Sequence, residues 1–282
     1  MQFNEFYNGR TGLTVGVNKV LFSEQSPYQK VEILETDTWG NLMTIDGMVM
    51  LSEKDEFVYH EMLAHVPMFA HPNPRRVLII GGGDGGTARE VLRHPTVEHV
   101  DMVEIDETVV RAAKQFMPGV GDFNNPKLHV HFEDGIAFVD KVTEPYYDVI
   151  IIDGSDPVGP AVDLFSEKFY QSCYRALTSR GVISSQTESP WVESYHPAIR
   201  KLFRSLDTIF EVSRMYLAFI PLYPSGMWSL AYASKGIHPH DSEVMDRVVK
   251  GTTSMDDALR YYNPEVHQGS FALPGFVREV LR

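Results

Sequence analysis

The chain has 282 residues, 43% of them hydrophobic and 22% charged, a composition typical of a globular protein with a large core. Acidic residues outnumber basic ones by 38 to 25, giving a net charge of −13, which argues against nucleic acid as a partner. We find one cysteine, Cys173, no secretory leader and no apolar run approaching the roughly 20 residues of a spanning helix. We therefore expect a soluble, cytoplasmic protein without disulfides or a membrane partner.

Residues 1–53 differ from the rest of the chain because they contain short, β-rich runs bounded by turns. The runs cover 14–22, 30–35 and 42–51, and Asp46-Gly47 in the last is a hairpin signal. We expect a small antiparallel β-domain here.

The remaining residues, 54–282, predict a second, larger domain of the α/β class. A helix at about 55–69 should end at His71-Pro72, because proline cannot continue a helix. Strands and helices then alternate, which predicts a parallel sheet covered by helices on both faces. The expected strands are 76–80, 99–104, 127–132, 147–153 and 181–186, and the expected helices are 86–93, 107–117, 134–141, 164–177 and 193–208.

The last third of the chain should add an antiparallel pair of strands, residues 212–220 and 227–234. The aromatic stretch 261–273 is predicted to be irregular and packed.

The glycines at the end of strand 76–80 carry the strongest functional signal. Gly81, Gly83 and Gly86 match the G-x-G-x-x-G turn that brings backbone close to a nucleoside cofactor. Asp84 lies inside this turn, and its negative charge disfavours the phosphate that such turns usually bind. The pattern therefore favours a cationic ligand, for which a sulfonium nucleoside is the obvious candidate.

Two acidic residues at the ends of the next strands could bind the nucleoside. Glu104 can reach ribose hydroxyls from the neighbouring strand, although NAD enzymes and sulfonium-dependent transferases share this feature. Asp134, which precedes Gly135, can accept from an adenine amino group or cap a helix, and the two roles are compatible.

A second acidic motif, Asp153-Gly154-Ser155-Asp156-Pro157, follows the buried run 149–152. Ligands of open α/β sheets bind beyond the carboxyl ends of the strands, so Asp153 and Asp156 should face the same crevice as Asp84. A turn before proline is the structural alternative for Asp156. The segment 157–166 could form a lid.

The other candidates are individually more often structural than functional. Tyr59 and His60 lie on the helix before the first strand of the sheet, Gln186 ends the fifth strand, and Tyr223 lies in a proline-glycine loop. His129 with His131, and His238 with His240, lack a third ligand at a plausible spacing, so we expect no metal site.

In this order, the motifs resemble those of the polyamine aminopropyltransferases, the family typified by spermidine synthase. The resemblance covers nearly the whole chain. It runs through Tyr28-Gln29, Asp46-Gly47, residues 55–62, 81–86, 103–106 and 153–160, Leu164-Phe165, Phe169-Tyr170, and residues 221–226 and 261–264.

The resemblance implies transfer of an aminopropyl group from decarboxylated S-adenosylmethionine, a co-substrate, to a diamine, usually putrescine. It also implies a Rossmann-like domain of the class I methyltransferase type behind the N-terminal β-domain, and a homodimer or homotetramer. Asp153 matches the proton acceptor. Gln29, Glu104, Asp134, Gly135 and Pro160 match nucleoside-contacting positions. His60, Asp84, Asp153, Gly154, Ser155 and Asp156 match the polyamine side, with Tyr59, Gln186 and Tyr223 as further wall residues.

Several alternatives stay open at this stage. The acceptor could be agmatine, cadaverine or spermidine, because the segment 186–191 varies within the family. A small-molecule N-methyltransferase shares the scaffold, a NAD-dependent dehydrogenase explains the glycines and Glu104 but not Asp84, and a polyamine-binding protein would bind both ligands without turnover.

Overall fold

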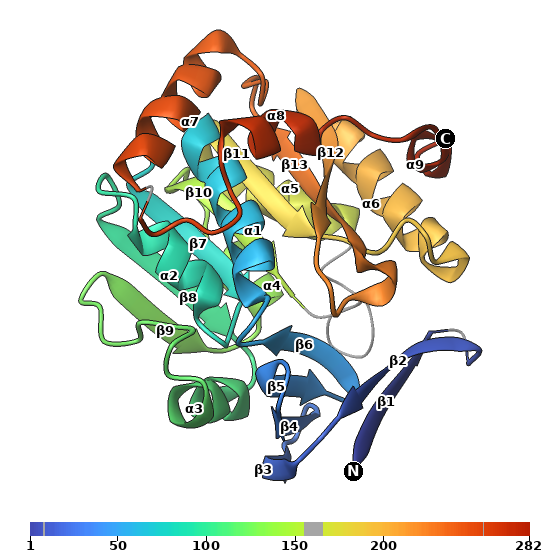
Figure 1. The fold of residues 1–282 in the computed structure, drawn as a ribbon. Helices are drawn as coiled ribbons and strands as arrows, with labels where there is room; N and C mark the ends of the chain where they lie inside the picture. The colour runs from blue at the N-terminus through green and yellow to red at the C-terminus, as the bar shows by residue number, and fades with distance from the viewer. Residues whose placement is uncertain (8, 155–165, 256) are drawn as a thin grey trace.

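The computed structural model describes residues 1–282 except 8, 155–165 and 256. Two small antiparallel sheets at the N-terminus precede a large, mostly parallel sheet with helices on both faces (Figure 1). This arrangement confirms the predicted α/β class with an N-terminal β-region. Within the described residues, no helix combines the length and apolar character needed to cross a membrane.

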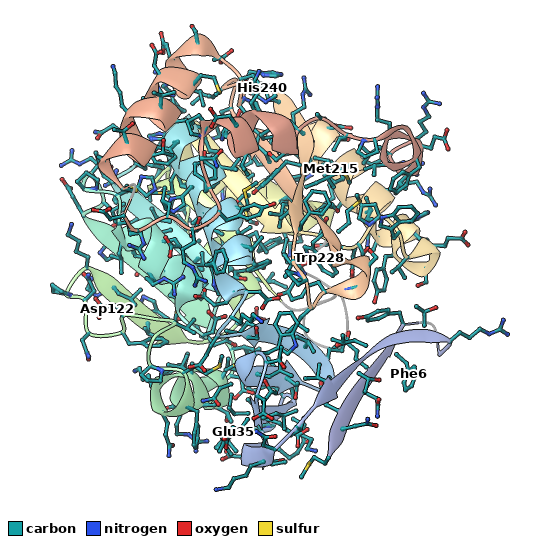
Figure 2. The ribbon with its side chains drawn as sticks, viewed as in Figure 1. Phe6, Glu35, Asp122, Met215, Trp228 and His240 are labelled. Carbon is teal, nitrogen blue, oxygen red and sulfur yellow. The ribbon has the colours of Figure 1, made fainter. Side chains whose placement is uncertain are left out.

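The N-terminal region forms a hairpin and a four-stranded sheet. Strands β1 (Gln2–Tyr7) and β2 (Thr11–Gly16) pair with each other, and β3 (Lys19–Gln25), β4 (Lys30–Thr36), β5 (Gly40–Ile45) and β6 (Met48–Ser52) follow in consecutive order. Phe6 on the hairpin is 65% exposed, whereas Trp228 is buried in the body of the molecule (Figure 2). The predicted Asp46-Gly47 turn joins β5 to β6, with both residues at positive φ.

The large sheet has the order β12-β13-β11-β10-β7-β8-β9. Strands β7 to β11 are parallel, and β13 pairs antiparallel with both β11 and β12. The bounds are β7 (Arg76–Gly81), β8 (His99–Glu104), β9 (Leu128–Phe132), β10 (Tyr147–Asp153), β11 (Leu177–Gln186), β12 (Val212–Phe219) and β13 (Met227–Ser234). The chain leaves β7 toward β8 and later returns to β10 on the other side, so strand order reverses between β7 and β10, where ligands of such sheets bind.

Helices cover the two faces because the inner strands are apolar on both sides. In β7, Val77 and Ile79 pack with α1 on one face, while Leu78 and Ile80 pack into the core on the other. The first face carries α1 (Glu56–Ala70), α2 (Gly86–Leu92), α7 (Ser242–Ser254) and α8 (Pro264–Ser270), and the second carries α4 (Gly135–Asp140), α5 (Glu167–Ala176), α6 (His196–Ile209) and α9 (Gly275–Val280).

Helix α3 (Glu107–Phe116) joins the two regions. Val109 and Ala113 pack against Val31 and Ile33 of the four-stranded sheet. This contact holds the N-terminal sheet over the crevice, so both regions can contribute walls to one cavity.

The structure differs from the sequence-based expectations in three places. The expected strand 14–22 is interrupted and belongs to two different sheets, because the hairpin β1–β2 ends before β3 begins. The expectation that 261–273 is irregular was wrong, since α8 lies there with Asn263 as its N-cap and Pro264 at its first turn. The sequence analysis also missed α7 and α9.

Candidate functional site

The reversal of strand order places the two acidic motifs side by side. Asp153, at the end of β10, is the register partner of Gly81, at the end of β7. The N–H of Gly82 donates to the Asp153 carbonyl at 2.9 Å. The glycine loop and the first two residues of the second acidic motif, Asp153 and Gly154, therefore form one continuous wall of the crevice.

The motif glycines are required by close contacts. Gly81 has φ +83°, and a Cβ there would lie 2.1 Å from the Asp153 carbonyl oxygen. A Cβ at Gly83 would lie 2.7 Å from Glu104 Oε2, and one at Gly86 would lie 2.2 Å from the His60 ring. The loop thus lets Glu104 and His60 approach the backbone, in addition to turning the chain.

A cavity of about 210 Å³ opens at this point, between the large sheet and the N-terminal sheet. It brings together ten residues that the sequence singled out: Gln29, Tyr59, His60, Asp84, Glu104, Asp134, Gly135, Asp153, Gly154 and Tyr223. Ser155, Asp156, Pro160 and the predicted lid up to residue 165 lie outside the described residues.

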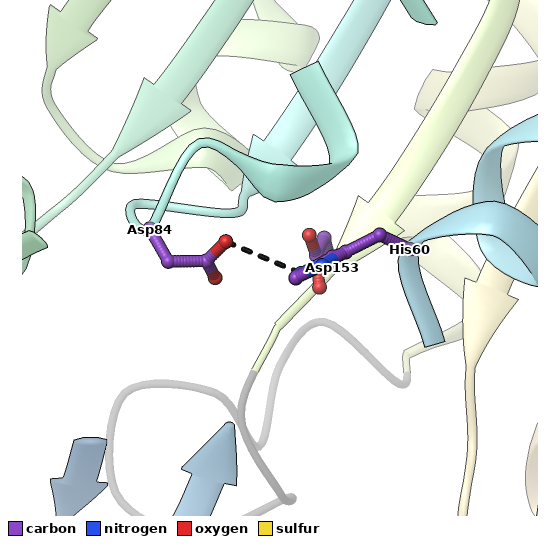
Figure 3. Close-up of side chains that lie close together, drawn as sticks. All are labelled: His60, Asp84 and Asp153. Atoms are coloured by element: carbon purple, nitrogen blue, oxygen red, sulfur yellow. Dashed lines mark ion pairs between the residues drawn. The ribbon is translucent and has the colours of Figure 1, made fainter. Parts of the chain in front are cut away.

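One end of the cavity is formed by Tyr59, His60, Asp84 and Asp153, which we call the acid cluster. Figure 3 shows three of these side chains, His60, Asp84 and Asp153. His60 Nε2 lies 3.2 Å from Asp84 Oδ1, which also accepts the N–H of Gly86 at 2.7 Å. Tyr59 donates its hydroxyl to Asp153 Oδ1 at 2.6 Å. Two carboxylates and one imidazole therefore meet at one end of the cavity.

Burial and neighbouring charges shift the pKa values of Asp153 and Asp84 in opposite directions. Burial raises the pKa of Asp153, and the charge of Asp84 raises it further. Burial also opposes ionisation of Asp84, but the positive charge and hydrogen bond of His60 outweigh it and lower the pKa of Asp84. Asp84 is therefore the fixed anion of the pair, and Asp153 is the better proton acceptor.

The acid cluster has the spacing of a cation site. One ligand-type atom each from His60, Asp84 and Asp153 lie within 4.8 Å of one another. A metal needs a bare imidazole nitrogen, yet His60 Nδ1 lies 2.5 Å from Glu56 Oε2 and Nε2 faces Asp84. Both ring nitrogens are thus engaged with carboxylates, and the geometry fits an organic ammonium better than a metal ion.

The other end of the cavity offers acceptors for a nucleoside. Glu104 is buried and accepts the N–H groups of Gly83 at 3.2 Å and Asp106 at 2.9 Å. Burial raises the pKa of Glu104 to about 7. Asp134 caps α4 by accepting from the N–H of Ile136 at 2.8 Å, and it also lines the cavity, so the helix cap does not remove it from the cavity wall.

Gln186 does not line this cavity. It lines an adjoining pocket of about 40 Å³, which shares Tyr59, Gly154 and Tyr223 with the main one. Tyr223 donates its hydroxyl to the Met50 carbonyl at 2.6 Å and packs its ring on Tyr59. Tyr59 and Tyr223 therefore form wall that the main cavity and the adjoining pocket share.

The sequence analysis missed several residues around the acid cluster. The N-terminal sheet supplies apolar wall from Met48 and Met50, and Glu5 of the hairpin lines the adjoining pocket. Thr87, one residue after the glycine loop, donates its hydroxyl to Asp153 Oδ2 at 2.6 Å. Glu56 precedes His60 by four residues, a spacing that places both on one helix face and was the one signal available for it.

Comparison with known proteins agrees with this geometry. Residues 56–242 match the family model for the spermine/spermidine synthase domain, and residues 1–53 match that for the spermidine synthase tetramerisation domain. The chain is 47% identical to a polyamine aminopropyltransferase of Alkaliphilus metalliredigens, covering 95% of this chain and 93% of the relative. It is 42% identical to that of Bacillus subtilis, covering 96% and 95%.

Solved structures are similarly close. A spermidine synthase in complex with the transition-state analogue AdoDATO superimposes with a TM-score of 0.94 at 44% identity, covering all of this chain and 94% of the other. The spermidine synthase of Thermotoga maritima gives 0.91 at 43% identity, with the same coverage. These matches extend over both the N-terminal strands and the large sheet.

Proposed function

Because the chain belongs to the spermine/spermidine synthase family and is a polyamine aminopropyltransferase, we propose that it transfers the aminopropyl group of decarboxylated S-adenosylmethionine to putrescine. The products are spermidine and 5′-methylthioadenosine. The observation that carries the proposal is the acid cluster, which places two part-buried carboxylates at one end of a cavity of about 210 Å³ whose other end offers acceptors for a nucleoside.

The two ends of the cavity suit the two substrates. We assign the nucleoside to the end with Gln29, Glu104, Asp134 and Gly135, where carboxylates can accept from ribose hydroxyls and an adenine amino group. The matching position of Pro160 would complete this side. The amine belongs at the acid cluster, with Gly154, Ser155, Asp156, Gln186 and Tyr223 as the remaining proposed contacts.

In this reaction the amine nitrogen attacks the carbon next to the sulfonium. The C–N bond forms as the C–S bond breaks, and the bonding electrons return to sulfur, which leaves as a neutral thioether. The amine proton passes to Asp153, directly or through the Tyr59 hydroxyl that contacts Oδ1. Since the leaving group is already activated, catalysis consists of alignment and proton removal.

The acid cluster helps binding more than it helps deprotonation. An ion pair at about 4 Å with an effective dielectric near 20 is worth about 4 kcal/mol, or roughly three pKa units, in favour of the ammonium. An alkyl ammonium titrates near 10.4 in water if it behaves like lysine. The distal amine can therefore stay charged, while the reacting amine must lose its proton, so turnover should rise into the alkaline range.

The deciding experiment is a steady-state comparison of putrescine, cadaverine, agmatine and spermidine with decarboxylated S-adenosylmethionine, following methylthioadenosine release. We expect putrescine to give the highest kcat/KM. A higher value for another amine would replace the proposed acceptor. Methyl transfer from ordinary S-adenosylmethionine would identify a methyltransferase, and ligand binding without any product would identify a binding protein.

We also propose that residues 1–53 and 54–282 are separate domains and that the first assembles the chain into a homodimer or homotetramer. The match of 1–53 to a tetramerisation domain and the 65% exposure of Phe6 support this assignment. Light scattering of the purified chain tests it, since a monomeric mass at micromolar concentration would contradict it.

A further inference from the structure

The His60 ring is held between two carboxylates. Nδ1 lies 2.5 Å from Glu56 Oε2, Nε2 lies 3.2 Å from Asp84 Oδ1, and His60 is 1% exposed. A neutral imidazole has only one N–H, so it can donate to one of these carboxylates but must present a lone pair to the other. An additional proton removes this conflict, and wherever it resides among the three groups, it balances one carboxylate charge.

Glu56 is oriented for this role by Arg89 of α2. Arg89 Nη1 donates to Glu56 Oε1 at 3.0 Å and Nη2 donates to Oε2 at 2.9 Å, which is a bidentate pair. Arg89 is fixed in turn by Glu90 Oε1 at 2.7 Å and the Val120 carbonyl at 2.8 Å. Neither Glu56 nor Arg89 lines the cavity, and Glu56 contacts the acid cluster through His60.

Electrostatics agree with the geometry. Burial lowers the pKa of His60, but the charge of Asp84 and the hydrogen bonds that the ring donates to both carboxylates overcome it and raise the pKa to about 10. The ionisable and charged groups that face His60 or its partners are Glu56 and Tyr59 of α1, Asp84 of the glycine loop, Arg89 of α2 and Asp153 of β10. Because Arg89 balances Glu56, the acid cluster keeps a single net negative charge.

The net charge of the acid cluster affects the step in which the reacting amine loses its proton. Two uncompensated carboxylates would hold the reacting amine as an ammonium, which has no lone pair for attack. A cation at His60, beside both aspartates, opposes the charge on that amine without removing either aspartate from the cavity.

We propose that Glu56 and Arg89 are positioning residues that keep His60 as an imidazolium, and that this cation makes the acid cluster favour the free-base form of the reacting amine. The inference rests on the proposed function and adds to it a device for neutralising the acceptor. It assigns a role to Glu56 and Arg89, which touch neither substrate.

The protonation state of His60 can be measured in the absence of turnover. In ¹⁵N-histidine-labelled, ligand-free protein, the His60 signals, identified by their loss in His60→Gln, should show two protonated nitrogens from pH 6 to 9. Glu56→Gln should lower the midpoint of this titration by at least one pH unit. A neutral imidazole spectrum at pH 8 in the unaltered protein would overturn the proposal, whatever the enzyme's substrates are.

The consequence for catalysis is read from the pH dependence of the single-turnover rate with saturating putrescine and decarboxylated S-adenosylmethionine, because this rate reports groups in the bound complex. His60→Gln should move the rising limb about one to two pH units upward, so that the rate falls roughly 10- to 100-fold at pH 7 and recovers at pH 10. A parallel profile, lowered equally at all pH values, would overturn the proposal.

Coupling distinguishes positioning from general damage. Glu56→Gln alone should move the limb in the same direction, and in the His60→Gln background it should add no further shift. Equal shifts in both backgrounds would overturn the role of Glu56. Glu98→Gln, the same change at an exposed ion pair with Arg75, is the matched control and should leave the profile unchanged. Absence of any product with all variants and the unaltered protein would instead refute the proposed function.

Discussion

Two clusters of ionisable side chains lie beside helices α1 and α2, and only one of them opens to the main cavity. The acid cluster contains two carboxylates and one imidazole at the cavity wall. A few residues further along both helices, Glu90 meets three basic groups, His65 Nε2 at 3.1 Å, Arg93 Nε at 2.7 Å and Arg89 Nε at 2.7 Å. We call Glu90, His65, Arg93 and His94 the inner cluster, in which His65 also contacts His94 at 2.9 Å.

The difference lies in how the charge is compensated. In the inner cluster the anion is surrounded by fixed cations, and its carboxylate is 1% exposed, which is the arrangement that a buried charge requires. In the acid cluster, His60 compensates only one of two aspartates. The remaining negative charge has no fixed cation among the described residues, so a ligand must supply one. The inner cluster thus stabilises the fold, whereas the acid cluster, beside the same two helices, gives up stability for binding.

The largest effect should come from Asp153, the proposed base. Asp153→Asn keeps the size of the side chain but removes the proton acceptor, and we expect kcat to fall on the order of 10²–10⁴-fold. Release of methylthioadenosine measures it. Asp140→Asn, at an exposed carboxylate, is the control and should change kcat less than twofold. Unchanged turnover in Asp153→Asn would remove this residue from the mechanism.

A substitution in the inner cluster should instead lower the free energy of unfolding. Glu90→Gln leaves the part-buried Arg89 and Arg93 without this anion, which costs about 3 kcal/mol of the free energy of unfolding, measured by urea denaturation. The loss in kcat should stay below tenfold. A large loss of turnover with unchanged stability would show that the inner cluster serves catalysis and not stability.

The pH dependence of that stability has a definite sign. Burial opposes ionisation of Glu90, but His65 and the two arginines lower its pKa from 4.5 to about 2. A carboxyl group with a depressed pKa stabilises the folded state above pH 4.5, and this contribution is lost as the pH falls toward 2. The difference in unfolding free energy between the unaltered protein and Glu90→Gln should therefore shrink between pH 5 and 2. A difference that grows with acid would contradict the assignment.

Sequence patterns predicted the large sheet and ten of the residues that line the cavity because both depend on local signals. The apolar runs and the glycine turn mark β7 and β10, and the rule for strand ends then places Asp84 and Asp153 together. The patterns failed where the information is non-local. Arg89 lies 33 residues from Glu56 in sequence and meets it only through the packing of α1 on α2. Strand β1 was missed because only one of its six residues is buried, and α8 because aromatic residues obscured the Asn263-Pro264 cap.

A smaller effect is expected at Asp84, the fixed anion of the acid cluster. Asp84→Asn should leave His60 facing one carboxylate and should weaken the preference for decarboxylated over ordinary S-adenosylmethionine. Ordinary S-adenosylmethionine carries a carboxylate that Asp84 would repel, so the ratio of the two inhibition or dissociation constants should fall roughly tenfold. Isothermal titration with both compounds measures it. Full retention of the preference would mean that shape, not charge, selects the donor.

The smallest effect should arise behind the acid cluster, at Thr87. Its hydroxyl, which is 0% exposed and does not line the cavity, donates to Asp153 Oδ2, while Tyr59 on the cavity side contacts Oδ1. Thr87 therefore leaves Oδ1 as the oxygen that meets the amine. Thr87→Val removes a hydrogen bond to a charged group at nearly constant volume, and we expect kcat at pH 7 to fall roughly threefold to tenfold. Since that hydrogen bond favours the ionised carboxylate, the acid limb of the rate profile should also move upward. Thr87→Ser keeps the donor and should preserve both values, whereas an equal loss in both variants would mean that packing of the γ-methyl group, rather than the hydroxyl, is what Asp153 needs.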